Sequence, residues 1–205
     1  MMLMKNIPTY KLELKLKNKG YQYIIGVDEA GRGGLALGVV AAAVNIPDGF
    51  DFTGIDDSKK LSSKKRELFY NKITESCDYA ISYVDEKIID SINILNATKL
   101  AMRQCVYKMI KSDFVLVDGN FKIDAIDVDQ RSIISGDDLV VSISAASILA
   151  KHYRDALVIE HHKKFPIYEW DKNKTYGTRK HKELIKLYGP SMYHRKSFHG
   201  VKEYL

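Results

Sequence analysis

Two adjacent acids, Asp28 and Glu29, follow an apolar run of β type at residues 23–27 and precede a glycine-rich segment at residues 30–34. Because successive side chains of a strand alternate between its faces, both acids cannot point to one side of a regular strand. Burying either carboxylate without compensation would be costly. An isolated pair of this kind is typical of a solvated turn. Beside a glycine-rich bend, the pair indicates carboxylates converging on a positive charge, most simply a divalent cation.

Two further acidic groups lie just beyond apolar runs: Asp118 follows residues 114–117, and Asp137-Asp138 follow residues 131–134. Carboxylate oxygens are hard ligands, so a site rich in them favours Mg²⁺ or Mn²⁺ over Zn²⁺. Three or four such groups can hold two ions about 4 Å apart, an arrangement that clamps the attacking and leaving oxygens in phosphodiester hydrolysis. The acids between these groups are interpreted as solvated loop residues: Asp124, Asp127 and Asp129.

The charge of the chain is unevenly distributed. Residues 1–150 hold 19 Lys/Arg and 20 Asp/Glu, whereas residues 151–205 hold 13 and 6, together with all six histidines. A basic C-terminal quarter indicates a polyanionic partner, most simply a phosphate-bearing one, although charge runs can also only solvate helix faces. The histidines of residues 151–165 are interpreted as surface or nucleic-acid-facing residues, not metal ligands: His152, His161 and His162.

Composition indicates an ordinary globular protein. Hydrophobic residues make up 45% of the 205 residues and charged residues 28%. The chain has no apolar run long enough for a membrane span, and residues 1–8 carry no secretory signal. Cys77 and Cys105 lack metal-ligand spacing and are expected to pack in the core in a reducing cytoplasm. We expect one cytoplasmic catalytic domain over residues 1–205, with an α/β core at about 20–150 and a basic helical portion at about 151–205.

Apolar alternation bounded by turn residues predicts strands at residues 22–28, 35–46, 79–84, 114–117 and 131–134. Helical spacing predicts helices within residues 88–110, 144–162 and 180–187. Ser58 is expected to cap a further helix, whose apolar face carries Leu61, Leu68, Phe69 and Ile73. Residues 9–19 alternate charge with leucine and fit either an edge strand or a short surface helix.

Residues 31–36 also satisfy the pattern G-x-G-x-x-A, and Asp51 lies where a dinucleotide-binding fold would place an acid. That fold needs a helix after the glycines, so that the helix N-terminus meets the pyrophosphate. Here the next segment, residues 39–47, has a strand pattern, and the two acids before the bend would repel a pyrophosphate. The sequence therefore argues against a nicotinamide site.

The order of seven segments resembles ribonuclease HII, the type 2 ribonuclease H family. They run over residues 22–200 and are Gly26–Gly33, Asp57–Leu61, Ile92–Thr98, Val117–Asn120, Ile143–Lys151, Asn173–Thr178 and His194–Phe198. The resemblance implies a ribonuclease H-like fold, a mixed five-stranded sheet flanked by helices. It also implies two divalent ions on four acids, which are Asp28, Glu29, Asp118 and Asp137, with Asp28 bridging the ions. Asp138 remains an alternative to Asp137, which is preferred for its spacing to residues 144–147.

The same resemblance implies an endoribonuclease, acting as a monomer, that hydrolyses the RNA strand of RNA–DNA hybrids and nicks duplex DNA 5′ to single ribonucleotides. Water would attack the phosphorus in line and leave 3′-hydroxyl and 5′-phosphate ends. The 2′-hydroxyl separates RNA from DNA, and the family approaches it with backbone groups of Gly31, Arg32 and Gly33. Tyr176 matches the tyrosine that stacks on the sugar at the junction. The candidate phosphate contacts are Lys59, Lys60, Lys151, Arg154 and Arg179.

Three departures from the family pattern affect positions outside the four acids. Gly34-Leu35-Ala36-Leu37-Gly38 replaces a proline-containing segment, so the start of the second strand is expected to be held loosely. Glu169 and Ser135 also replace the usual residues. The related type 3 family has Gly-Thr-Gly where this chain has Gly31-Arg32-Gly33. An alternative of another class is a protein that holds nucleic acid with its basic quarter and does no chemistry, but carboxylates facing phosphates weaken such binding unless metals intervene.

Overall fold

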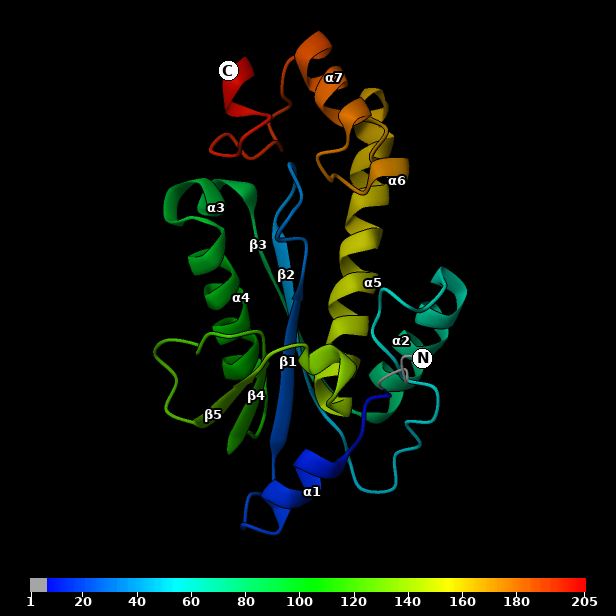
Figure 1. Cartoon of the computed structure of the whole chain (residues 1–205), viewed down its shortest axis with the longest axis vertical. Helices are drawn as coiled ribbons and strands as arrows, with labels where there is room; N and C mark the ends of the chain where they lie inside the picture. The colour runs from blue at the N-terminus through cyan, green and yellow to red at the C-terminus, as the bar shows by residue number, and fades with distance from the viewer. Residues whose placement is uncertain (1–6) are drawn as a thin grey trace, which may run out of the picture.

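A five-stranded mixed sheet runs through the middle of the computed structural model, which describes residues 7–205 (Figure 1). Its strands are β1 (Ile24–Ala30), β2 (Val39–Asn45), β3 (Asp78–Val84), β4 (Phe114–Asp118) and β5 (Asp129–Ile133). They lie in the order β3-β2-β1-β4-β5, where β1 is antiparallel to β2 and parallel to β4. The mixed five-stranded sheet expected from the sequence is confirmed. Residues 1–6, part of the segment predicted to carry no secretory signal, lie outside the described residues.

Helices cover both faces of the sheet (Figure 1). They are α1 (Lys11–Lys17), α2 (Ser63–Ser76), α3 (Glu86–Ile92), α4 (Ile94–Lys108), α5 (Val141–Lys164), α6 (Trp170–Asn173) and α7 (Arg179–Tyr188), with 3₁₀ helices η1 (Gly136–Asp138), η2 (Pro166–Tyr168) and η3 (Lys202–Tyr204). On one face α4 packs against β2 and β3. On the other face α5 packs against β1 and β2, and α2 packs on α5. No helix within residues 7–205 is long and apolar enough to cross a membrane.

The alternation of β1 places its residues in two different cores. Ile25 and Val27 are fully buried in the cluster that includes α4. Gly26, on the other face, meets α5 so closely that a Cβ there would lie 2.2 Å from the carbonyl carbon of Ser142. Small residues at the start of α5, among them Ala145 and Ala146, are buried against the sheet, as the sequence predicted. Glycine and small side chains therefore set a short distance between α5 and β1.

The segment before β2 is held more tightly than the sequence suggested. Leu35, Ala36 and Leu37 are buried beneath the C-terminal elements α6 and α7. The Leu35 amide donates to the carbonyl of Thr175 at 2.7 Å, and the Leu37 amide donates to the carbonyl of Tyr193 at 2.9 Å. The expectation of a loosely held segment is wrong, and β2 begins only at Val39 because residues 35–37 pair with the C-terminal part of the chain instead of the sheet.

Two local expectations need correction or completion. Ser62, not Ser58, caps α2, since its side chain accepts from the Lys65 amide, whereas Ser58 is buried and bonds across to α5. Leu68, expected on the apolar face of that helix, is exposed. The ambiguous segment at residues 9–19 contains the short helix α1. Both cysteines are buried and free, which confirms their place in the core.

We predict that Gly26→Ala lowers the free energy of unfolding by about 2 kcal/mol, because the added methyl group would overlap the backbone of α5. Urea denaturation measures this loss. Gly49→Ala is the comparison, since Gly49 has a positive φ of 81° but open space around it, and should cost about 1 kcal/mol. An equal or smaller loss for Gly26→Ala would contradict the proposed closeness of α5 and β1.

Candidate active site

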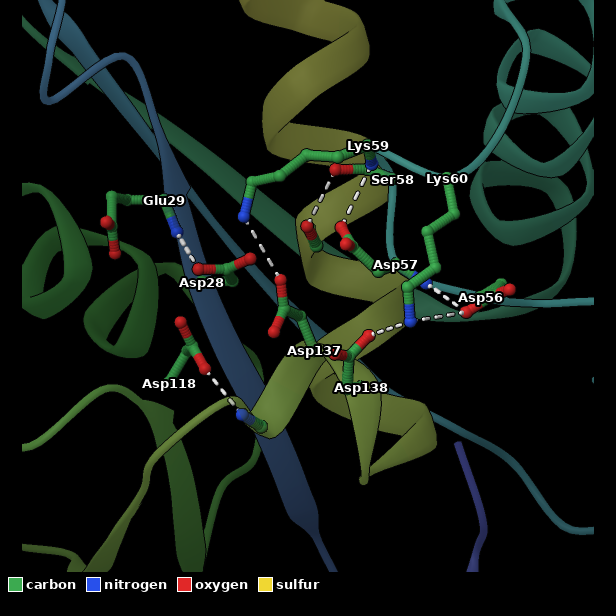
Figure 2. Close-up of polar contacts among 12 residues, drawn as sticks. Asp28, Glu29, Asp56, Asp57, Ser58, Lys59, Lys60, Asp118, Asp137 and Asp138 are labelled. Atoms are coloured by element: carbon green, nitrogen blue, oxygen red, sulfur yellow. Dashed lines mark hydrogen bonds and ion pairs between the residues drawn. The ribbon is translucent and has the colours of Figure 1, made fainter. Parts of the chain in front are cut away.

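The carboxylates of Asp28, Glu29 and Asp118 meet where β1 extends beyond the last residue pair that it shares with β4. Val27 pairs with Val117, so Asp28 and Asp118 are the next residues of neighbouring parallel strands. Asp28 is buried on the α5 side of the sheet, while Glu29 leaves β1 in another direction, with its carboxylate 3.5 Å from the Arg32 guanidinium (Figure 2). The two adjacent acids thus do not share a face, as predicted from strand geometry, and they lie near Asp118 because β4 ends there while β1 continues to Ala30.

The 3₁₀ helix η1 adds a fourth carboxylate, that of Asp137. The Gly136 amide donates to Oδ1 of Asp118 at 2.7 Å, which fixes η1 against the end of β4. Asp137 is buried and lies beside Asp28, and Nζ of Lys59 is 3.3 Å from its Oδ2 (Figure 2). Asp138 turns away and pairs with Lys60 at 2.5 Å. We refer to Asp28, Glu29, Asp118 and Asp137 as the acidic cluster.

A short hydrogen-bond chain fixes the Asp28 carboxylate. Its Oδ1 accepts the Glu29 amide at 2.6 Å, and the Ser147 side chain lies close enough to lower the pKa of the same carboxylate. The Ser147 hydroxyl lies 2.9 Å from that of Ser58, so α5 and the loop before α2 both support Asp28. Sequence reasoning missed this role of Ser58 and Ser147. The available signal was their position as small polar residues inside two of the segments that carried the family resemblance.

Burial and, after it, repulsion between neighbouring carboxylates disfavour ionisation of Asp28 and Glu29. Burial, then the charges of Glu29 and Asp118, raise the pKa of Asp28 well above its usual range. Burial also raises the pKa of Glu29, although Arg32 opposes this. Burial of Lys59 lowers its pKa, but the nearby carboxylates reverse this and raise its pKa overall. One lysine thus compensates only part of the negative charge.

The donor set of the acidic cluster fits Mg²⁺ or Mn²⁺. Carboxylate oxygens are the ligands that these hard ions prefer, and a divalent cation would offset the repulsion that Glu29 and Asp118 exert on Asp28. As they lie among residues 7–205, no group of three or more His, Cys, Asp or Glu side chains is arranged to hold a metal ion. Lys59 occupies one side of Asp137 in this arrangement, so its ammonium group contributes the positive charge there.

The glycine-rich bend lies next to Tyr176, as the sequence predicted for a common substrate surface. Gly31 has a φ of +103°, a conformation that favours glycine. Gly34 and Tyr176 form an isolated backbone bridge. A Cβ on Gly33 would lie 3.5 Å from the ring of Tyr176, which is 43% exposed. The structure therefore brings Gly31, Arg32, Gly33 and Tyr176 together.

Arg154 is not the exposed phosphate contact that the sequence suggested. Its side chain is 1% exposed, and its Nη2 donates to the Thr175 hydroxyl at 2.7 Å. A Cβ on Gly31 would lie 1.9 Å from Nε of Arg154, so the arginine fills the space directly behind the bend. A charged residue in a helix usually faces water, but this one supports the bend and the loop before Tyr176 from inside.

The other basic candidates lie apart from one another. Lys59 faces the acidic cluster, and Lys60 is paired with Asp138 beside it. Lys151 pairs with Asp155 one turn along α5 at 2.6 Å. On α7, Arg179 is almost fully exposed and pairs only with Glu183 of the same helix in the described structure. Of these four candidates, the structure associates only Lys59 directly with the acidic cluster.

Comparisons with known proteins agree on one family. The family model described as Ribonuclease HII matches residues 25–201. The chain is similar to a protein named Ribonuclease HII from Caldicellulosiruptor bescii, with 50% identity over 191 residues, 92% of each chain. Its fold resembles that of the ribonuclease H2 from Pyrococcus horikoshii OT3, with a TM-score of 0.75 and 24% identity, over 89% of this chain and 96% of that one. It also resembles the structure of Bst-RNase HIII in complex with Mn²⁺, with a TM-score of 0.73 and 17% identity, over 88% and 68% of the two chains.

We predict that Asp28→Asn stabilises the metal-free protein at pH 7 by about 1 kcal/mol, because it removes a buried charge that Glu29 and Asp118 repel. The folded-state pKa of Asp28 is raised, so wild type gains stability relative to the variant as the pH falls through that pKa. The advantage of Asp28→Asn should therefore shrink towards pH 4. Thermal unfolding in EDTA at several pH values measures it, and an advantage that grows on acidification would contradict the assignment.

Proposed function

Because the chain belongs to the ribonuclease HII family, we propose that it nicks duplex DNA 5′ to single embedded ribonucleotides with two divalent ions held at the acidic cluster. Membership of the family makes it a metal-dependent endoribonuclease that degrades the RNA strand of RNA–DNA hybrids. The observation that carries the finer proposal is the contact of Tyr176 with the glycine-rich bend. A site that contacts both the ribonucleotide and the deoxyribonucleotide beside it needs two adjacent protein elements, here the glycine-rich bend and Tyr176.

The acidic cluster supports the metal-ion part of the proposal. When bound, Mg²⁺ or Mn²⁺ would polarise the scissile phosphate and favour attack by water. Asp28 is suited to bridge two ions because the Glu29 amide and Ser147 fix its carboxylate, which leaves little to reorganise. Glu29, Asp118 and Asp137 would complete the ligand set. The Mn²⁺ complex of Bst-RNase HIII is consistent with Mn²⁺ as one usable ion.

The bend supports the substrate part of the proposal. Gly33 presents no side chain, so a sugar can approach its backbone closely, and the half-exposed Tyr176 ring beside it can stack on the next sugar. In-line attack would leave 3′-hydroxyl and 5′-phosphate ends. Lys59 now pairs with Asp137. Once metal ions neutralise that carboxylate, the Lys59 ammonium group could release it and bind a substrate phosphate instead. Substrate contacts by Lys60, Lys151 and Arg179, the monomeric state and the cytoplasmic location stay predictions.

We expect wild-type protein with Mg²⁺ or Mn²⁺ to make one nick 5′ to the ribonucleotide in a labelled duplex and to leave an all-DNA duplex intact. Asp28→Asn should reduce the rate more than about 100-fold, because it removes the central metal ligand, while hybrid binding survives. Asp138→Asn is the matched control and should keep the activity, since Asp138 faces Lys60. Turnover by Asp28→Asn would refute the metal assignment, and absence of cutting with either ion would favour a binding protein.

Tyr176→Ala should impair nicking at a single ribonucleotide by about tenfold more than cutting of a long hybrid, because the ring is proposed to stack only at the junction. Steady-state rates on the two substrates measure the ratio. Tyr176→Phe keeps the ring and should behave like wild type. Tyr107→Ala is a second control, because it removes another exposed tyrosine that lies in α4, outside the proposed substrate surface. Equal losses on both substrates would contradict a junction role for Tyr176.

A further inference from the structure

Arg195 is fully buried behind the glycine-rich bend and donates hydrogen bonds to four backbone carbonyls. Its Nε reaches the carbonyl of Leu37 at 2.8 Å, and Nη1 reaches that of Arg32 at 2.8 Å. Its Nη2 is shared between the carbonyls of Gly31 at 2.7 Å and Gly38 at 3.1 Å. One planar guanidinium thus joins the bend to the start of β2, and the rigid fork of arginine sets their relative position.

These bonds also set the direction of two amides in the bend. In a trans peptide the carbonyl and the N–H of the same unit point in opposite directions, and the described chain has no cis peptide. Since the carbonyls of Gly31 and Arg32 point to Arg195, the N–H groups of Arg32 and Gly33 point away from it. Neither N–H donates to another group within residues 7–205. The bend therefore presents two free donors on the side opposite the guanidinium.

The charge of Arg195 makes this arrangement specific. Within the described residues no carboxylate pairs with it, and the compensation comes from the carbonyl dipoles and from the ring of Phe198, 4.9 Å away. Burial, and then the charge of Arg154, lower the pKa of Arg195 to about 9, which still leaves it protonated at neutral pH. A buried cation is costly unless its hydrogen bonds are satisfied, so the carbonyls must stay turned towards it.

We propose that Arg195 is a positioning residue for ribonucleotide specificity: it holds the peptides of the bend so that the Arg32 and Gly33 amides donate to the ribose 2′-hydroxyl and its adjacent phosphate. The inference rests on the proposed function, in which the bend approaches the ribonucleotide. Arg195 touches no substrate itself. Its effect is on the difference in affinity between ribonucleotide-containing and all-DNA duplexes, and a residue with only a general folding role would not change that difference.

The test uses full-length protein in the Asp28→Asn background with Mg²⁺, so that binding is measured without cleavage. Fluorescence anisotropy gives the Kd for a duplex with one ribonucleotide and for the same duplex in DNA. Arg195→Lys keeps the charge but cannot make four bonds in one plane, and it should lower the preference for the ribonucleotide about tenfold with all-DNA affinity unchanged. Lys196→Met, at the exposed neighbouring residue, should leave the preference unchanged.

The outcomes separate the inference from the proposed function. If the parent protein, Asp28→Asn with Arg195 intact, shows no preference for the ribonucleotide-containing duplex, both the proposed function and the inference are refuted. A parent with the preference and a folded Arg195→Lys variant that retains it would refute the role of Arg195 alone. If Arg195→Lys fails to fold, Phe198→Leu removes the ring beside the guanidinium without emptying the buried position, and should lower the preference about threefold. An unchanged preference there would also refute the proposal.

Discussion

The close contact between α5 and β1 is the constraint on which both halves of the site depend. The missing side chain of Gly26 lets the start of α5 lie against the strand. At that distance Ser147 reaches the Asp28 carboxylate, and Arg154, seven residues further along α5, lies behind Gly31. Seven residues are close to two helical turns, so both side chains leave the same face of α5. One rigid helix thus supports the acidic cluster and the glycine-rich bend at a fixed separation.

Much of this site could be predicted from sequence because its acids follow apolar strands, where a charge is conspicuous. Spacing favoured Asp137 over Asp138, and the 3₁₀ geometry of η1 gives the physical reason, because it turns Asp137 towards Asp28 and Asp138 towards Lys60 (Figure 2). Arg154 was wrongly expected at the surface, since an arginine within the basic C-terminal quarter of a chain is usually exposed. The hydrogen-bond partners of its Nη atoms come from the loop at Lys174 and Thr175, some 20 residues later, and no local sequence pattern predicts them.

The two most deeply buried guanidinium groups do not pair with the acidic cluster. Negative charge is concentrated in the acidic cluster, where burial and repulsion raise the pKa of Asp28 and Glu29. Two buried guanidinium groups, those of Arg154 and Arg195, lie behind the bend and hydrogen-bond neutral oxygens instead of these carboxylates. If they paired with the acids, the carboxylates would be less available to the metal ions proposed for this site. Backbone and hydroxyl oxygens therefore compensate the cations and leave the acids available.

The pairing of the bend with the Tyr176 loop has a consequence for how this family can vary. The bridge between Gly34 and Tyr176 and the bond between Leu35 and Thr175 are made by main-chain atoms. The separation between the two surfaces is therefore insensitive to many side-chain changes but sensitive to the number of residues on either side. Relatives should therefore differ by substitutions in the bend and in the Tyr176 loop. A single-residue insertion or deletion in either segment would shift the register between the two.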